Sequence, residues 1–145
     1  MRTRTLISAL TILLLLLAGL AVAQDNTKVK IKKVAAPQTS PTSGHDMYMS
    51  YCASCHGTDA KGNGPAAPAL KTAPTDLTTL SRNNKGSFPS DHVATVLAKG
   101  SVAAHGSAEM PIWGPVFRSI NPGHETEVQL RIANLDRYLE SLQLK

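Results

Sequence analysis

The sequence predicts an all-α fold, and three observations predict it. Apolar residues at the C-terminal end of the chain recur in steps of four and three, which marks one face of a helix. The stretch 90–100 begins with two good helix-capping residues, Ser90 and Asp91, and ends at Gly100. No run of alternating apolar and polar residues is long enough to indicate a useful strand. We expect about three main helices, joined by short helices and loops.

Residues 1–23 are typical of a signal peptide. Arg2 and Arg4 precede an apolar run at 6–17, and the small residues at 21–23 form an Ala-Val-Ala cleavage site before Gln24. The alternative is an uncleaved anchor, because residues 6–23 approach the length that spans a bilayer. We expect cleavage, and a mature protein in the periplasm or at the extracytoplasmic face of the membrane.

Residues 24–43 have the composition of a flexible basic linker. They contain four lysines, two prolines and several Ser and Thr residues, with almost nothing to bury. The alternation of Val29 and Ile31 with lysines hints at a short strand, but no partner hairpin follows. The lysines can attract an anionic membrane surface or an acidic partner, so membrane association through the N-terminal part stays open.

The net charge of the chain is concentrated in these first two segments. The formal charge of the 145 residues is +5, whereas residues 44–145 contain nine basic and nine acidic side chains. A folded domain without a basic excess lacks the attraction that dominates non-specific binding of nucleic acids, so DNA and RNA are excluded as expected partners. Only six aromatic residues are available for a core, which suggests that something else helps to fill it.

The chemistry of the chain is concentrated at its two cysteines. Cys52 and Cys55 are followed directly by His56, and a Cys-x-x-Cys-His motif in an exported chain indicates covalent attachment of haem. Residues three apart on a helical turn lie on one face, so both thiols can reach the same edge of a haem. The adjacent imidazole can then bind the iron. We predict one haem c, attached at Cys52 and Cys55, with His56 as the fifth iron ligand.

Three other uses of a cysteine pair fit the sequence less well. A structural zinc site needs four ligands, and no second cysteine pair is present. A thioredoxin-like dithiol belongs at the end of a strand within an α/β pattern, which the upstream residues do not show. A disulfide between residues three apart would close a very short loop and add little stability.

From Gly44 to its C-terminus, about 100 of its 145 residues, the chain resembles the class I c-type cytochromes. The block GHDMYMSYCASCHG is similar to the family's N-terminal helix, and TDAKGNGPAAPAL is similar to its glycine- and proline-rich loop. The resemblance implies a small cytochrome c fold wrapped around one haem. In the family a proline carbonyl of that loop accepts the Nδ1 proton of the proximal histidine; Pro68 is the match, with Pro65 as second choice.

The sixth iron ligand is assigned to Met110, in the segment AEMPIWGP. Met47 and Met49 lie just before Cys52 on the attachment helix and cannot easily cross the ring, whereas Pro111 and Gly114 suit a loop over its far face. The family's distal methionine is found in a similar Met-Pro setting. His105 is the alternative ligand; the remaining histidines are expected at helix starts or on the surface: His45, His92 and His124.

Two further side chains could contact the haem propionates. The resemblance implies that Trp113 donates its indole proton to a propionate, and the alternative is that it only forms a wall of the pocket. Arg82 could pair with a propionate, although an exposed position is the commoner fate of such an arginine.

The C-terminal part of the chain predicts a helix with one buried face. Its apolar stripe consists of Val128, Ile132, Leu135, Leu139 and Leu142. Glu125 and Glu127 near its start suit the helix dipole, and Asp76 is a candidate cap for a shorter helix upstream. The family packs an aromatic residue of the last helix against the N-terminal glycine, so we expect Tyr138 over Gly44.

With His56 and Met110 both bound, the iron has no vacant position, and catalysis at the metal is not expected. We therefore predict a monomeric extracytoplasmic electron carrier, not an enzyme, that exchanges single electrons with redox partner proteins of a respiratory chain. Two alternatives stay open. One is a fixed electron-relay subunit of a larger redox enzyme, and the other is a peroxidase or gas-binding protein with a labile Met110.

Overall fold

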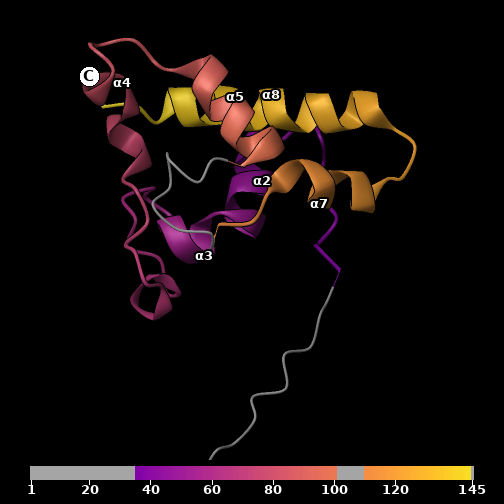
Figure 1. The fold of residues 1–145 in the computed structure, drawn as a ribbon, viewed down its shortest axis with the longest axis horizontal. Coiled ribbons are helices and arrows are strands. Elements are labelled where there is room, and N and C mark those ends of the chain that lie inside the picture. Colours follow the sequence, from indigo (N-terminus) through magenta and orange to yellow (C-terminus); the bar gives the residue numbers. More distant parts are fainter. Residues whose placement is uncertain (1–34, 101–109, 145) are drawn as a thin grey trace, which may run out of the picture. The chain divides into compact units, whose positions relative to one another are not determined.

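The computed structural model describes residues 35–100 and 110–144, and all regular elements in these ranges are helices (Figure 1). The predicted all-α class is confirmed. The predicted signal peptide and the first part of the predicted linker lie outside the described residues. The elements are α2 (Gly44–Tyr51), α3 (Ala53–His56), the 3₁₀ helices η1 (Ala67–Ala69) and η2 (Leu77–Thr79), α4 (Leu80–Asn83), α5 (Ser90–Lys99), α7 (Trp113–Ile120) and α8 (Glu125–Ser141).

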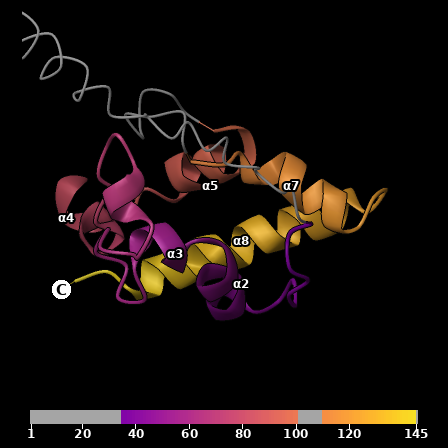
Figure 2. The same cartoon turned by 90° about the horizontal axis from the view of Figure 1, so that it is seen from below.

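Helix α8 is the element on which the others pack. Helices α2, α5 and α7 all contact it, and Figures 1 and 2 show it running along the length of the domain. Its predicted apolar stripe is confirmed: four members are buried, and the fifth, just beyond the helix end, is partly buried. Burial of such a stripe, rather than intrinsic propensity, supplies most of the stability of a helix in a domain.

The crossing of α2 and α8 depends on Gly44. A β-carbon added there would lie 2.2 Å from the carbonyl oxygen of Asn134 and 2.7 Å from Cβ of Tyr138. Only glycine allows the two backbones to approach so closely. The rings of Tyr48 and Tyr138 then meet with their centroids 5.4 Å apart. The expected packing of Tyr138 over Gly44 is confirmed.

Helix α5 ends where the sequence predicts, at Gly100, whose φ is 72°. Its start differs by one residue, because Pro89 is the N-cap and Ser90 is already helical. The Ser90 hydroxyl donates instead to Asp136 on α8, and the second carboxylate oxygen of Asp136 is buried with no partner among the described residues. The predicted cap at Asp76 is confirmed: its carboxylate accepts from Thr78 N–H at 2.9 Å and begins η2.

Helix α7 was not predicted, because its first residues resemble a loop. Gly114, which we assigned to a loop over the pocket, belongs to this helix. A β-carbon at Gly114 would lie 2.2 Å from the carbonyl oxygen of Ala98 on α5. The glycine therefore allows α7 and α5 to cross closely, which is a packing role rather than a turn.

The last part of the predicted linker is attached to the helices. Residues 35–43, indigo in Figure 1 and called the strap below, lead into α2. Ser43 caps α2 by accepting from Asp46 N–H at 3.1 Å, and Asn134 Nδ2 donates to the Pro41 carbonyl oxygen at 2.9 Å. Composition alone does not distinguish these residues from the lysine-rich part of the segment.

Candidate haem-binding site

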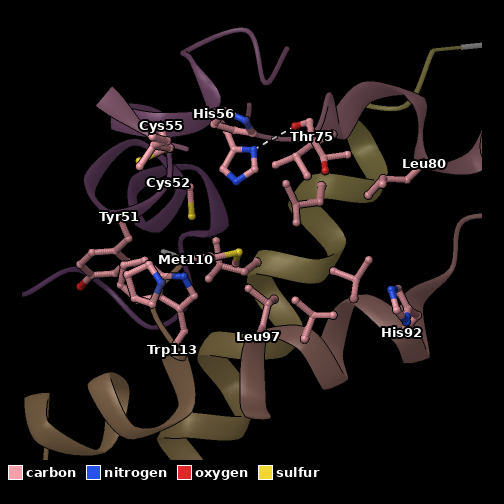
Figure 3. A pocket seen from close by; sticks show the side chains of 18 of the residues that line it. Tyr51, Cys52, Cys55, His56, Thr75, Leu80, His92, Leu97, Met110 and Trp113 are labelled. Carbon is pink, nitrogen blue, oxygen red and sulfur yellow. Dashed lines mark hydrogen bonds between the residues drawn. The ribbon is translucent and has the colours of Figure 1, made fainter. Parts of the chain in front are cut away.

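A cavity that is partly open to solvent lies between α3, α5, α8 and the segment before α7 (Figure 3). Its walls are mainly apolar. Helix α5 contributes Val93, Val96 and Leu97, and α8 contributes Leu135 and Leu139 from its buried stripe. A concave, mainly apolar lining is typical of a site for an organic ligand or cofactor.

Both cysteines of the motif line one end of this cavity. The turn that carries them is held by backbone hydrogen bonds from the following loop. Gly62 N–H donates to the His56 carbonyl at 2.8 Å, Gly64 N–H to the Cys55 carbonyl at 3.1 Å, and Ala66 N–H to the Ser54 carbonyl at 2.8 Å. These bonds satisfy the carbonyls that a short helix leaves unpaired at its end.

His56 is buried, and Figure 3 shows its ring pointing into the cavity. Its Nδ1 lies 3.0 Å from the carbonyl oxygen of Thr75. A carbonyl can only accept, so Nδ1 carries the hydrogen and Nε2 keeps a free lone pair. Burial lowers the pKa of His56, and the bond to Thr75 opposes this only in part. A neutral imidazole with one fixed tautomer is the form that binds a metal.

The hydrogen bond of His56 differs from the one that the resemblance implied. Pro68 and Pro65 are exposed and do not line the cavity, and the acceptor is the carbonyl of Thr75, directly after Pro74. The loop that contains Pro68 packs instead against the cysteine turn, where a β-carbon on Gly64 would lie 2.4 Å from the Ser54 carbonyl oxygen. The carbonyl that accepts from Nδ1 of His56 therefore lies seven residues later in the sequence than predicted.

Met110 lines the cavity on the side opposite His56, and Figure 3 shows the imidazole and the thioether facing each other across it. Met47 is buried away from the cavity and Met49 is exposed, as expected for the attachment helix. His105, the alternative ligand, lies outside the described residues.

Trp113 is buried and forms part of the cavity wall beside Met110. Its ring lies against that of Tyr51, with centroids 5.3 Å apart, and Figure 3 shows the two rings together at one end of the cavity. Tyr51 was missed from the sequence, although it lies one residue before Cys52. Contact of Trp113 with a propionate stays a prediction.

The remaining candidates are at or beyond the edge of the site. Arg82 is exposed on α4 and does not line the cavity, so its alternative reading as a surface arginine fits better. His92, expected at a helix start or on the surface, is exposed at the start of α5 but also lines the cavity. His45 and His124 lie exposed at the starts of α2 and α8.

The state of the cysteines argues against the other uses of the motif. Burial, and next the nearby Cys55, raises the pKa of the Cys52 thiol to about 12. A redox-active dithiol needs the opposite shift, because the thiolate is the reactive form. Within the described ranges, no group of three or more His, Cys, Asp and Glu side chains could hold a metal ion, which gives a zinc site no support.

A family model described as cytochrome C oxidase, cbb3-type, subunit III matches residues 39–119, more than half of the chain. The chain belongs to this family. Its domain is therefore a c-type cytochrome domain, which carries haem c with its iron and transfers electrons. Neither a curated protein nor a solved structure matches the chain significantly. Over residues 35–100 and 110–144, no helix is long and apolar enough to cross a membrane.

The residues of this cbb3-type domain fit haem c. Two thiols lie at one end of the cavity, on the turn that ends in His56. An imidazole with a free nitrogen and a thioether face each other across the apolar space. Nitrogen and sulfur are the axial donors that c-type haem iron takes, and two thiols are what covalent attachment needs.

Proposed function

We propose that the domain is an extracytoplasmic carrier of single electrons, with one haem c attached to Cys52 and Cys55. His56 and Met110 are its axial ligands. The observation that carries this proposal is the pair of opposed donors across an apolar cavity with both cysteines at one end. Bound haem c supplies a one-electron change between Fe(II) and Fe(III).

The side chains have separate tasks in this function. Thr75 holds the imidazole of His56 in one orientation and makes it a better donor through the Nδ1 bond. The thioether of Met110 is neutral and polarisable, so it favours Fe(II). The apolar residues of α5 and α8 exclude water, which penalises the extra charge of Fe(III) and raises the potential. His56 and Met110 would together occupy the open positions of the iron and leave none for a substrate.

A fixed relay subunit is the second candidate, because the family description names a subunit of an oxidase. In both cases the chain passes electrons between a donor and an acceptor in a respiratory chain, and in both an N-terminal signal at 1–23 directs export. They differ in whether the mature chain moves freely. Gel filtration of native extract, with the mass of the mature N-terminus, separates a cleaved free monomer from an anchored or complexed subunit.

An optical spectrum and a redox titration of the purified protein test the site itself. We expect the bands of a low-spin haem c, a sulfur-to-iron charge-transfer band in the ferric state, and no carbon monoxide adduct when reduced. A colourless sample after denaturation and acid-acetone extraction would contradict covalent attachment. Carbon monoxide binding at neutral pH would instead support a labile Met110 and the gas-binding or peroxidase alternative.

A further inference from the structure

A chain of hydrogen bonds joins α8 to the strap and then to the wall of the cavity. Arg131 Nη1 donates to Thr39 Oγ1 at 3.1 Å, and Thr39 Oγ1 lies 2.8 Å from the hydroxyl of Tyr51. That hydroxyl donates to the carbonyl oxygen of Pro37 at 2.5 Å. Because a hydroxyl has only one hydrogen, Thr39 must donate to Tyr51. The donor and acceptor at every link are thus fixed.

Arg131 is unusually placed for an arginine, since its side chain is only 3% exposed. A buried guanidinium is costly unless charge and hydrogen bonds compensate it. Glu127, one turn earlier, accepts from Nε at 3.0 Å and from Nη2 at 2.8 Å, and the Thr39 carbonyl accepts from Nη2 at 2.9 Å. The guanidinium carbon also lies 5.9 Å from the ring centroid of Phe117. Two of the hydrogen bonds of Arg131 therefore go to the strap.

Tyr51, at the far end of this series of hydrogen bonds, is part of the candidate haem site. Its ring is buried, lines the cavity and lies against Trp113. Phe117 completes the cluster, with ring centroids 5.7 Å from Tyr51 and 5.8 Å from Trp113. One side of Tyr51 therefore faces the cavity, while its hydroxyl is held by the strap. Contacts that hold the strap in place therefore also hold the ring of Tyr51 in the cavity wall.

We propose that Arg131 is a positioning residue for the haem pocket. It fastens the strap over Tyr51, and the strap holds the ring of Tyr51 against Trp113 so that water stays out of that end of the cavity. This inference rests on the proposed function, since it requires haem in the cavity. Loss of the strap would admit water, stabilise the charge of Fe(III) and lower the midpoint potential.

The test compares variants of the holoprotein that remove one link each. Arg131→Leu removes both bonds to the strap, Tyr51→Phe removes a single oxygen atom, and Thr39→Val removes only the hydroxyl. Thr39→Ser keeps that hydroxyl and serves as the conservative rescue. Arg137→Leu is the matched control, because Arg137 is exposed on the same helix and, among the described residues, bonds only to Asn134 and the Ala133 carbonyl. Two quantities are measured: the rate of limited proteolysis within residues 35–43, and the midpoint potential.

For Arg131→Leu we expect at least tenfold faster cleavage of the strap and a fall in potential. At a fixed solution potential the Fe(III) to Fe(II) ratio should rise severalfold, a tenfold rise being about 59 mV for one electron. Tyr51→Phe and Thr39→Val should lower the potential with smaller effects on cleavage, and Thr39→Ser and Arg137→Leu should change neither.

Three outcomes would overturn the inference. Unchanged strap cleavage in Arg131→Leu would show that Arg131 does not fasten the strap, and faster cleavage with an unchanged potential would reduce it to a structural residue. Should Arg131→Leu fail to fold, Tyr51→Phe decides, because it changes one atom: an unchanged potential overturns the proposal. The wild-type spectrum, recorded first, shows separately whether haem is bound, so failure of the proposed function is recognised independently.

Discussion

The two sides of the cavity are built by different means. On the side of His56, main-chain hydrogen bonds fix the cysteine turn, the loop after it and the imidazole itself. On the side of Met110, the wall consists of packed side chains from α5 and α7, and Met110 itself is only partly buried. Main-chain bonds tolerate changes of side chain, whereas packing responds to each methyl group. The His56 side should therefore stay intact under mutations that alter the Met110 side.

Loss of haem attachment should disrupt both sides of the cavity and should have the largest effect of the changes described. In a Cys52→Ala, Cys55→Ala double variant, haem no longer covers the apolar walls of the cavity. The six aromatic residues of the chain are too few to replace it. We expect loss of most of the helical signal in far-ultraviolet circular dichroism. Ser54→Ala, between the two cysteines and exposed, is the control and should keep it. Native helicity in the haem-free double variant would show that the protein core suffices alone.

Replacement of Met110 by alanine should affect the Met110 side alone. The haem should stay attached and the helices folded, but the charge-transfer band should disappear and carbon monoxide should bind to the reduced protein. The potential should fall by about 59 mV or more, a tenfold change in the redox ratio. Met49→Ala, at an exposed position on α2, is the control. An unchanged band would assign the sixth position to a sulfur other than that of Met110.

Two glycines provide a matched test of the same comparison. A β-carbon at Gly44 or at Gly114 would lie 2.2 Å from a carbonyl oxygen of the facing helix, so each change to alanine should cost about 1–3 kcal/mol of unfolding free energy. Gly114→Ala should also lower the midpoint potential, because α7 carries the wall beside Met110, whereas Gly44→Ala should not. Gly123→Ala, at a φ of 86° with nothing among the described residues within 4 Å of its β-carbon, is strained without a clash and should leave the potential unchanged. Equal potentials in the Gly44 and Gly114 variants would remove the distinction between the two sides.

The smallest expected effect concerns Asp136, which joins α8 to the start of α5 through Ser90. Burial raises the pKa of Asp136, with Glu140 and Asp91 adding to the rise and Ser90 opposing it. The folded protein therefore holds a proton that the unfolded chain releases. The raised pKa of Asp136 therefore stabilises the folded protein. This stabilisation is fully present below the ordinary carboxyl pKa and declines as the pH rises through the raised pKa of Asp136.

Chemical denaturation from about pH 3 to about pH 7 measures this decline. Asp136→Asn should remove it. Asp46→Asn is the control of opposite sign, because hydrogen bonds from His45 and Ser43 lower the pKa of Asp46 and make its contribution appear as the pH rises. An Asp136→Asn variant with the same pH profile as the wild type would show that Asp136 does not titrate differently on folding.

The sequence predicted those features that side-chain type and spacing encode. The stripe on α8, the end of α5 at Gly100 and the cap at Asp76 follow from residues whose chemistry admits few alternatives. The cysteine turn and the position of Met110 on the cavity wall belong to the same group. In each case the local pattern and the tertiary contact agree. The close packing of Tyr138 over Gly44 was instead implied by the family resemblance.

The features that were missed depend on the main chain or on distant partners. The carbonyl of Thr75 has no side-chain signature, and any residue could supply it. Arg131 resembles a surface arginine until the strap is placed over it. Helix α7 contains Gly114 and Pro115 near its start, so its beginning reads as a turn, although proline is well tolerated in the first turn of a helix.

The bond between His56 and the main chain at Thr75 has an evolutionary consequence. No single codon change can delete a peptide oxygen, so the donor strength of the imidazole is protected from point mutation. Divergence in the electrochemistry of this domain would then have to arise elsewhere, through the thioether, the aromatic cluster or the strap. Selection could thus change the midpoint potential of the protein while the hydrogen bond that orients the imidazole of His56 stays intact.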